Sequence, residues 1–492
     1  MKLTTTQRDR AAGVLLGQAC GDALGVPYEF GRPPMKHDPV MKGGGLGPYA
    51  PGEWSDDTQM AICIARVAAT GADLTGEAAL DEIAKAFVDW RRHGASDIGN
   101  QTAAVLGAGE VDARNQARDS GRNGDERGYP WATFLIKAAN DFTATRARAA
   151  GNGALMRGGT VGLTRLHDRE ATARAATAVA SLTHADPLVT DSCVLHAEAV
   201  RVAVLEARLD LRAGLDLIPA QRRSQWTAWV DSAERADPAS IDGNGSTFGA
   251  LRAAWAAITS TDEGSPGHGR RALIAAVRAG HDTDTVAAIT GALVGARYGV
   301  SGLPAVWRRR VHGWPGLRGR DLIELALRTV GECDDTTWPA RDHEISWGGA
   351  IEVPVSWSDR LTIGNQAALA TTKATAVVSL SRIGRLEDRA TDKHVQAWLV
   401  DSDDPVAHND LAYALNDAAS AVQELLDEGE TVFLHCVHAH HRTPSVALLH
   451  AMRFGGLGPR DAVRAVRTAL GRKDFDGLLW RTALEEGRRY AR

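Results

Sequence analysis

Two acidic stretches, each followed by a run of small and apolar residues, constrain this chain most. The first is Ser55-Asp56-Asp57-Thr58, ahead of residues 61–69, and the second is Gly280-His281-Asp282-Thr283-Asp284-Thr285, ahead of residues 286–296. Serine, threonine and aspartate are favoured at helix starts because their side chains accept hydrogen bonds from free backbone N–H groups. The pattern therefore predicts two helices that begin with carboxylate and hydroxyl groups.

The oxygen atoms in these stretches also suit a metal centre. Asp282 and Asp284 alternate along an extended entry, so both can reach one hard cation, and Thr285 adds a neutral oxygen. Ligand sets made only of oxygen favour Mg²⁺ or Mn²⁺ over zinc. Two such clusters fit a two-ion centre, because the cations offset the repulsion between carboxylates. The candidate ligands are Ser55, Asp56, Asp57, Asp282, Asp284 and Thr285; the alternative is that both stretches only cap helices.

Four further motifs complete a recognisable order along the chain. They are Gly17-Gln18-Ala19-Cys20-Gly21-Asp22-Ala23-Leu24-Gly25, Gly151-Asn152-Gly153-Ala154-Leu155-Met156-Arg157, Leu182-Thr183-His184-Ala185 and Gly295-Ala296-Arg297-Tyr298-Gly299. With the two acidic stretches they resemble the ADP-ribosylglycohydrolase family over roughly residues 8–330. The resemblance implies a compact all-helical domain with a binuclear Mg²⁺ or Mn²⁺ centre, acting on an ADP-ribosylated protein or small molecule.

The same resemblance implies roles for single residues. The turn Gly151-Asn152-Gly153 would cradle the ribose and diphosphate side of ADP-ribose, and Asp97 and His184 would lie near the substrate. Glu29 matches an acid that lies on a flap over the metals in some relatives; the alternative is an ordinary loop glutamate. Glu29 or a metal-bound carboxylate such as Asp57 would handle the proton in catalysis.

The composition excludes several other classes of protein. With 44% hydrophobic and 24% charged residues the chain is typical of a soluble globular protein, and its 492 residues predict two or three domains. A net charge of −5 gives no reason to expect nucleic acid or an anionic membrane as a partner. No apolar run approaches the roughly 18 residues of a membrane span, and the polar N-terminus lacks a signal-peptide pattern. Because five scattered cysteines also argue against a disulfide framework, we expect a cytoplasmic protein.

The sequence pattern changes after residue 330. Residues 331–345 are polar and irregular and predict a linker. Short β-rich runs follow at 351–355, 376–380 and 395–400, with helical stretches between and after them, notably at 410–428. This alternation predicts an α/β domain over residues 346–490. Within the first part, the Gly-, Arg- and Asp-rich residues 111–128 predict an exposed loop.

A cysteine loop is the key element of the second domain. A buried strand is expected to end at His435 and a helix to begin near Pro444, and the loop between them carries Cys436 and, six residues later, Arg442. Backbone N–H groups, a helix N-terminus and a guanidinium would then face one point. Such a point is an oxyanion site, and it favours a thiolate nucleophile at Cys436.

The pattern Cys-x5-Arg-Thr after an apolar strand resembles the cysteine-dependent phosphatases, particularly the dual-specificity group, over roughly residues 346–490. The resemblance implies phosphate contacts from His435 and Thr443 and a general acid at Asp404, with Asp401 and Asp403 as close alternatives. Ala439 stands where the group usually has glycine, which leaves a phosphate-binding domain without turnover as one alternative. A soft metal site is another; it would join Cys436 to His438, His440 and His441.

The sequence thus favours a two-domain hydrolase. The first domain would remove ADP-ribose from an arginine, a serine, a nucleotide base or a metabolite, and the second would cleave a phosphomonoester through a phosphocysteine at Cys436. The alternative is a protein that only binds ADP-ribose and phosphorylated ligands as a sensor.

Overall fold

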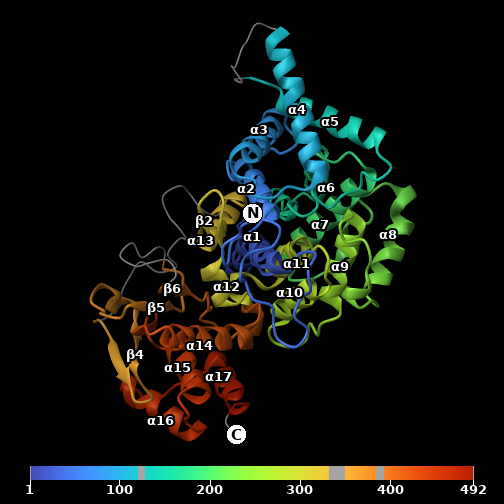
Figure 1. Cartoon of the computed structure of the whole chain (residues 1–492). Helices are drawn as coiled ribbons and strands as arrows, with labels where there is room; N and C mark the ends of the chain where they lie inside the picture. Colours follow the sequence, from blue (N-terminus) through green and yellow to red (C-terminus); the bar gives the residue numbers. More distant parts are fainter. Residues whose placement is uncertain (1, 120–127, 332–348, 384–392, 491–492) are drawn as a thin grey trace.

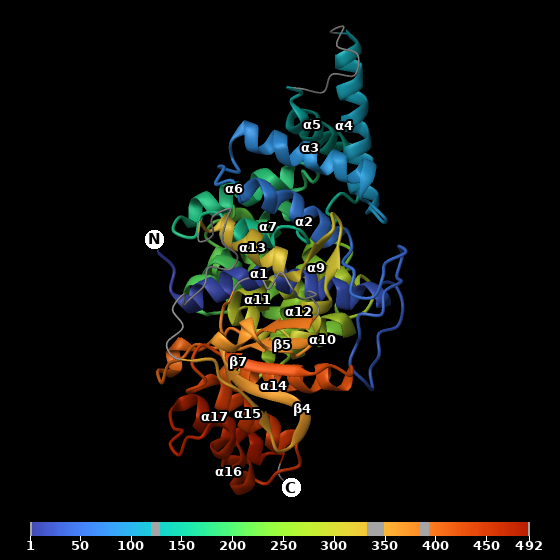
Figure 2. The same ribbon diagram turned by 90° about the vertical axis from the view of Figure 1, so that its left-hand side faces the viewer.

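A computed structural model describes residues 2–119, 128–331, 349–383 and 393–490. We call the described residues up to 331 the helical part and those from 349 onward the C-terminal part. In Figure 1 the helical part runs from blue to yellow, and the orange and red C-terminal part lies below it. The view turned by 90° in Figure 2 shows the same two layers, with α1 and α11 near the middle of the helical part.

Helices make up nearly all of the regular structure in the helical part. A short antiparallel pair, β1 (His312–Gly313) and β2 (Leu317–Arg318), is the exception among its described residues. The helices are α1 (Thr5–Gly25), α2 (Asp56–Ala68), α3 (Glu77–His93), α4 (Asn100–Asp119), α5 (Trp131–Thr145), α6 (Arg169–Ser181), α7 (Pro187–Glu206), α8 (Ala220–Ala233), α9 (Thr247–Thr259), α10 (His268–Arg278), α11 (Thr283–Tyr298), α12 (Ala305–Arg310) and α13 (Gly319–Thr329).

Helices α1 and α11 form the centre of this part, and glycines set their spacing. A Cβ built on Gly17 would lie 2.2 Å from the carbonyl oxygen of Gly291, and one on Gly13 would lie 2.3 Å from that of Gly295. Both distances are far below a van der Waals contact, so the two backbones touch. Nearly every residue of both helices is buried. This close approach places the C-terminal end of α1 beside the N-terminus of α11.

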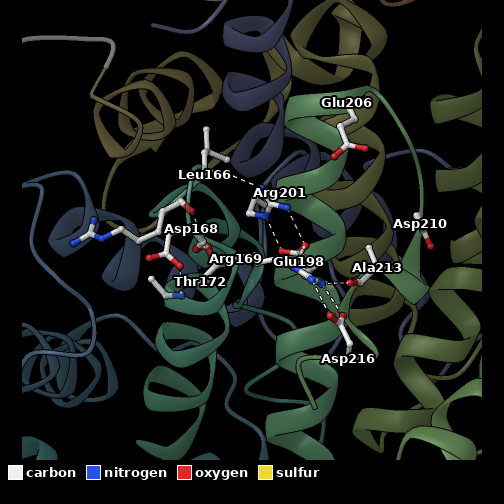
Figure 3. Close-up of polar contacts among 12 residues, drawn as sticks. Leu166, Asp168, Arg169, Thr172, Glu198, Arg201, Glu206, Asp210, Ala213 and Asp216 are labelled. Atoms are coloured by element: carbon white, nitrogen blue, oxygen red, sulfur yellow. Dashed lines mark hydrogen bonds and ion pairs between the residues drawn. The ribbon is translucent and has the colours of Figure 1, made fainter. Parts of the chain in front are cut away.

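A buried carboxylate on α7 anchors the neighbouring helix α6. Glu198 is 1% exposed and accepts hydrogen bonds from Arg169 Nε at 3.2 Å and from Arg201 Nε at 2.7 Å, as Figure 3 shows. Arg169 also donates to the carbonyl of Ala213 at 2.6 Å and pairs with Asp216. Two guanidiniums compensate the buried charge, and the network fixes α6, α7 and the turn that follows α7.

The C-terminal part is built on a five-stranded sheet in the order β3-β4-β7-β5-β6. Strand β3 pairs antiparallel with β4, and the other neighbours are parallel. Strand β7 lies in the middle and is buried along its length. The elements are β3 (Glu352–Val355), β4 (Ser358–Asn365), β5 (Ala376–Ser379), β6 (His394–Gln396), β7 (Val432–Cys436), α14 (Leu411–Asp427), α15 (Arg442–Arg453), α16 (Pro459–Leu470) and α17 (Leu478–Arg488).

Buried polar contacts join the two parts. Arg308 of α12 forms an ion pair with Asp417 of α14 at 3.1 Å, with side chains only 8% and 10% exposed. Asp417 also accepts a hydrogen bond from the Ala305 N–H at 3.0 Å. Trp398 of the C-terminal part belongs to the same apolar core as the helical part. The two parts therefore share an interface from which water is largely excluded.

The two predicted helix starts are confirmed, because α2 begins at Asp56 and α11 at Thr283. The loop predicted at 111–128 is wrong for its first half, since α4 continues to Asp119; its buried residues pack on α5. The predicted linker at 331–345 lies almost wholly outside the described residues. Among the described helices, none is long and apolar enough to cross a membrane.

Candidate metal centre and cysteine loop

Three helices bring carboxylates to one buried point. Asp22 belongs to the last turns of α1, Asp57 to the first turn of α2 and Asp284 to the first turn of α11; each is at most 3% exposed. One carboxylate oxygen from each of the three lies within 4.8 Å of the others. Gly25 permits this meeting, because a Cβ on it would lie 2.4 Å from the Cα of Asp284.

Asp22 also fixes the start of α2. Its Oδ1 accepts hydrogen bonds from the N–H and the hydroxyl of Ser55 at 2.9 and 2.8 Å, and its Oδ2 accepts one from the Thr58 N–H at 3.0 Å. The side chains of Ser55 and Asp282 stand at the N-cap positions of α2 and α11, yet neither caps its own helix. Helix capping alone therefore does not explain the two acidic stretches.

A second group of acids adjoins the first. Glu29, Asp282 and Asp284 each have a carboxylate oxygen within 4.8 Å of the other two, so Asp284 belongs to both groups. The two remaining candidate ligands flank the groups along the chain: Asp56 is half-buried at the start of α2, and Thr285 is 4% exposed. The structure thus brings Ser55, Asp57, Asp282 and Asp284 together with Glu29, and a role for Asp56 and Thr285 as ligands stays a prediction.

Burial and mutual repulsion raise the pKa values of these acids. Burial first, then neighbouring carboxylates, raises the pKa of Glu29 to about 8 and that of Asp56 to about 8. The same causes raise the pKa of Asp57 and of Asp284 well above the usual value. At Asp22 burial is partly opposed by hydrogen bonds, and its pKa rises to about 6. So many carboxylates can ionise together in a dry pocket only if positive charge enters it.

Two details of the hydrogen bonding fit a bound cation. Asp57 Oδ1 is buried without a hydrogen-bond partner, a state that buried polar atoms rarely keep. Ser55 Oγ lies 2.8, 3.0 and 3.4 Å from oxygens of Asp22, Asp57 and Asp284, although a hydroxyl has only one hydrogen to donate. Since every atom that could ligate a metal here is an oxygen, the residues fit a hard divalent cation.

The glycine turn adjoins this cluster through Asn152. Asn152 Nδ2 donates to Asp282 Oδ2 at 2.8 Å and to the carbonyl of Asn244 at 2.9 Å. Gly151 and Gly153 lie on either side, half-buried. The turn predicted to hold ADP-ribose is therefore hydrogen-bonded directly to Asp282, in the acidic stretch at the start of α11.

His184 packs against the two glycines of that turn. A Cβ on Gly151 would lie 3.4 Å from His184 Nε2, and a Cβ on Gly153 would lie 3.1 Å from Cε1. Burial, then the charge of Arg157, lowers the pKa of His184 to about 3, so the ring is neutral. Arg157 donates to the carbonyl of Gly153 at 2.8 Å and to Thr183 Oγ1 at 2.6 Å. This buried arginine ties the glycine turn to the histidine, a link that the sequence analysis did not assign.

Glu29 and Asp97 lie at the edge of the cluster. Glu29 follows the 3-10 helix η1 (Val26–Tyr28), and the N–H of the next residue, Phe30, donates to the His281 carbonyl at 2.6 Å. Asp97 is half-buried before α4, and its Oδ1 accepts a hydrogen bond from the Ile98 N–H. The Asp97 charge helps to raise the pKa of Glu29.

Residues 3–338 match the family model described as ADP-ribosylglycohydrolase, which is more than half of the chain. The chain belongs to the ADP-ribosylglycohydrolase family. It is 31% identical over 307 residues to the ADP-ribosylarginine hydrolase Tri1 of Pseudomonas putida (strain GB-1), a match that covers 62% of this chain and 74% of that protein. It is 27% identical over 304 residues to the ADP-ribosyl-[dinitrogen reductase] glycohydrolase of Rhodospirillum rubrum, covering 61% and 89%.

A solved structure of human DUSP28 also matches this glycohydrolase-family chain. The identity is 17%, the TM-score is 0.25, and the match covers 29% of this chain and 98% of that one. A likeness at this TM-score carries no argument about function.

In the C-terminal part, Cys436 ends the central strand β7 and Arg442 opens α15, with the five residues 437–441 between them. Both are buried, at 1% and 5% exposed. His441, the N-cap residue of α15, makes no side-chain cap, which leaves the first amides of that helix free for a ligand. Arg442 donates to the carbonyl of Leu399 at 3.2 Å, and its Nε is buried without a hydrogen-bond acceptor.

The other residues predicted for this loop have different neighbours. His435 stacks on Phe433, its Nε2 contacts Ser379 Oγ at 2.7 Å, and burial lowers its pKa to about 4. The hydroxyl of Thr443 donates to the carbonyl of Gly364 at 3.2 Å. His435 thus supports the loop from within the sheet, and Thr443 holds α15 to β4. A phosphate contact from either residue stays a prediction.

The three candidate general acids differ in the groups that they contact. Asp404 is exposed and caps the 3-10 helix η8 (Pro405–Ala407) by accepting from the Val406 N–H at 3.0 Å. Asp403 accepts a hydrogen bond from the Leu478 N–H. Asp401 alone of the three contacts the loop, with its carboxylate 2.8 Å from His441 Nδ1 and 3.7 Å from Arg442 Nε.

Asp22 is the main site residue that the sequence analysis missed. Its signal was present: it is the only charged residue between positions 11 and 25 of α1, a run of mostly small and apolar residues that is buried throughout. A buried carboxylate in such a helix requires hydrogen-bond donors or a cation.

Proposed function

We propose that the helical part hydrolyses the bond between ADP-ribose and an arginine side chain, using divalent cations held by the acidic cluster. Two similar proteins are named as an ADP-ribosylarginine hydrolase and an ADP-ribosyl-[dinitrogen reductase] glycohydrolase. The observation that carries the proposal is that two clusters of three acidic residues, Asp22, Asp57 and Asp284 and then Glu29, Asp282 and Asp284, have Asp284 in common. A protein that only bound ADP-ribose would need no such concentration of buried acids.

The cations proposed are Mg²⁺ or Mn²⁺, two in number. Asp22, Ser55, Asp57 and Asp284 would hold one, and Asp282, Asp284 and Glu29 or Thr285 the other. Bound there, the ions would supply the positive charge that orients the ribose hydroxyls and activates water near the anomeric carbon.

The chain's own residues would perform the remaining tasks. The Gly151–Gly153 turn would hold the ribose and diphosphate through its backbone N–H groups, and neutral His184 would support that turn from behind. Glu29 reaches the cluster from a separate loop and would move the proton between water and the leaving guanidine. Glu29→Gln should then lower kcat far more than it raises KM.

A panel of substrates tests the acceptor. The full chain is incubated with peptides ADP-ribosylated on arginine or on serine and with ADP-ribosylated nucleic acid, and release of ADP-ribose is measured. The proposal expects turnover of the arginine conjugate at least 100-fold above the others. Faster release from serine or from a base would assign a different acceptor to the same centre.

A second activity is favoured by the geometry of Cys436 and Arg442. We propose that the C-terminal part cleaves a phosphomonoester. The Cys436 sulfur would attack phosphorus, the P–O bond to the leaving group would break, and Asp401 would give that oxygen a proton. Water would then cleave the S–P bond, releasing phosphate and restoring the thiolate. Cys436→Ser should abolish release of p-nitrophenol from p-nitrophenyl phosphate, and Asp401→Asn should lower it more than Asp404→Asn.

A further inference from the structure

A cavity of about 530 Å³ lies between the two parts of the molecule and opens on the cysteine loop. His438, His441 and Arg442 line it from the loop that follows Cys436. Thr5, Thr6, Asp9 and Ser301 line it from the helical part. The first turn of α1 and the 3-10 helix η5 (Val300–Gly302) thus complete a wall that the C-terminal part does not possess alone.

Hydrogen bonds join the two parts of the molecule at residues that line the cavity. Asn409 donates to Asp9 Oδ2 at 3.1 Å and accepts from Arg10 Nη1 at 2.9 Å. Asp410 accepts from the Gly267 N–H at 2.8 Å. Asp9 and Arg10 are each only 6% exposed, so this seam is dry. An extended polypeptide leading out of the cavity along the junction would have to break these contacts.

The walls carry polar groups of several kinds, among them the carboxylates of Asp9, Asp401 and Asp410 as well as guanidiniums and hydroxyls. Two guanidiniums, Arg442 and Arg382, line the cavity and are each 5% exposed; Arg382 stacks on Trp398 at 4.7 Å. Ser301 lines the same space from the helical part and is 7% exposed, and its hydroxyl oxygen is buried without a hydrogen-bond partner. Buried hydroxyls are rarely left unpartnered, so Ser301 is a second pointer to a ligand.

We propose that this cavity binds a small phosphorylated sugar, with the phosphate toward Arg442 and the sugar hydroxyls toward Ser301 and the first turn of α1. The volume lies within the roughly 300–1,000 Å³ of small-molecule sites. The guanidiniums suit a phosphate dianion, and the hydroxyl-bearing wall suits a polyol. The inference rests on the phosphate site proposed at Cys436 and Arg442. It implies that residues of the helical part determine which phosphorylated substrate that site accepts. A phosphorylated protein side chain is the competing occupant.

The test uses the full chain with Cys436→Ser, which retains the site without the nucleophile. Binding of tungstate, ribose 5-phosphate and a phosphotyrosine dodecapeptide is measured by calorimetry. We expect ribose 5-phosphate to bind at least 10-fold more tightly than the peptide. Adding Ser301→Ala should weaken ribose 5-phosphate at least 5-fold and leave tungstate unchanged.

Thr6→Phe supplies a second variant, since it fills the cavity from the α1 side. It should weaken ribose 5-phosphate at least 10-fold, whereas the matched substitution Thr177→Phe, at an exposed position on α6, should have no effect. Retained ADP-ribosyl hydrolase activity shows that each variant is folded. Equal or tighter binding of the peptide, or no effect of Ser301→Ala and Thr6→Phe, would overturn the inference and leave the phosphate site standing. Failure of tungstate to bind would remove the phosphate site itself, and the inference with it.

Discussion

Gly17 of α1 and Gly291 of α11 meet with their backbones in contact. A Cβ on Gly291 would lie 2.1 Å from the Gly17 carbonyl oxygen, and one on Gly17 would lie 2.2 Å from the Gly291 carbonyl oxygen. The contact has a consequence for the site, because α1 carries Asp22 and α11 carries Asp284. The separation of the two helices therefore sets the separation of two carboxylates in the proposed metal centre.

Gly17→Ala should destabilise the protein although alanine is the better helix former. Alanine usually gains about 0.5–1 kcal/mol over glycine inside a helix. Here the clash with backbone atoms costs about 1–3 kcal/mol or more, so the net effect is a loss, measured by denaturant unfolding. Gly107→Ala on α4 is the matched control, because its Cβ would meet only the end of the Arg91 side chain at 3.4 Å. Equal stabilisation of both variants would contradict the close contact.

The ion pair between Arg308 and Asp417 predicts that the two parts unfold together. Asp417→Ala leaves a buried guanidinium unpaired and the Ala305 N–H without its acceptor, which should cost about 3–5 kcal/mol. Asp461→Ala breaks an exposed pair with Arg464 and should cost less than about 1 kcal/mol. The wild type could instead show two separate calorimetric transitions, with Asp417→Ala changing the midpoint temperature of only one of them. That result would show that the interface does not couple the unfolding of the two parts.

Ala439 holds a left-handed backbone with φ of 57° in the cysteine loop. A non-glycine residue in that region is strained by roughly 1–2 kcal/mol, so Ala439→Gly should stabilise the protein, by about 0.5–1 kcal/mol after the entropy of glycine is included. Ala207, with φ of 53° at the end of α7, provides the control. Both glycine variants should raise the melting temperature, but only Ala439→Gly should raise phosphatase turnover. A lower melting temperature in Ala439→Gly would show that the backbone at Ala439 is not strained.

Buried neutral histidines predict how stability falls in acid. Burial lowers the pKa of His196 from 6.5 to about 4, while its contact with the Ile289 carbonyl opposes the shift. Between pH 6.5 and about 4, His196 is therefore protonated in the unfolded chain but not in the folded one. The free energy of unfolding consequently decreases as pH falls from 6.5 toward 4. The slope from this residue is at most about 1.4 kcal/mol per pH unit. His196→Gln should flatten the pH dependence in that window; an unchanged slope would place the effect elsewhere.

Much of the site was predictable because its residues act locally. The oxygen-rich starts of α2 and α11 follow from hydroxyl and carboxylate groups beside apolar runs, and the strand–loop–helix around Cys436 follows from the same kind of pattern. Asp22 was not predictable from its neighbours, since its role depends on a helix contact made by glycines some 270 residues apart along the chain. Distant contacts also explain Asp401 and Thr443. Their partners, His441 and Gly364, come from other elements, and spacing along the chain does not reveal them.

The proposed metal centre makes hydrolysis of ADP-ribosylarginine dependent on a divalent cation, and this dependence can be measured directly. The full chain is stripped with EDTA, its metal content is checked by elemental analysis, and activity is followed as Mg²⁺ or Mn²⁺ is added back. We expect no turnover without metal, recovery on addition of metal, and a loss of activity of at least 1,000-fold in Asp284→Asn, because Asp284 belongs to both clusters of carboxylates. Undiminished turnover by verified metal-free protein, or near wild-type activity of Asp284→Asn in Mg²⁺, would contradict the proposed metal centre.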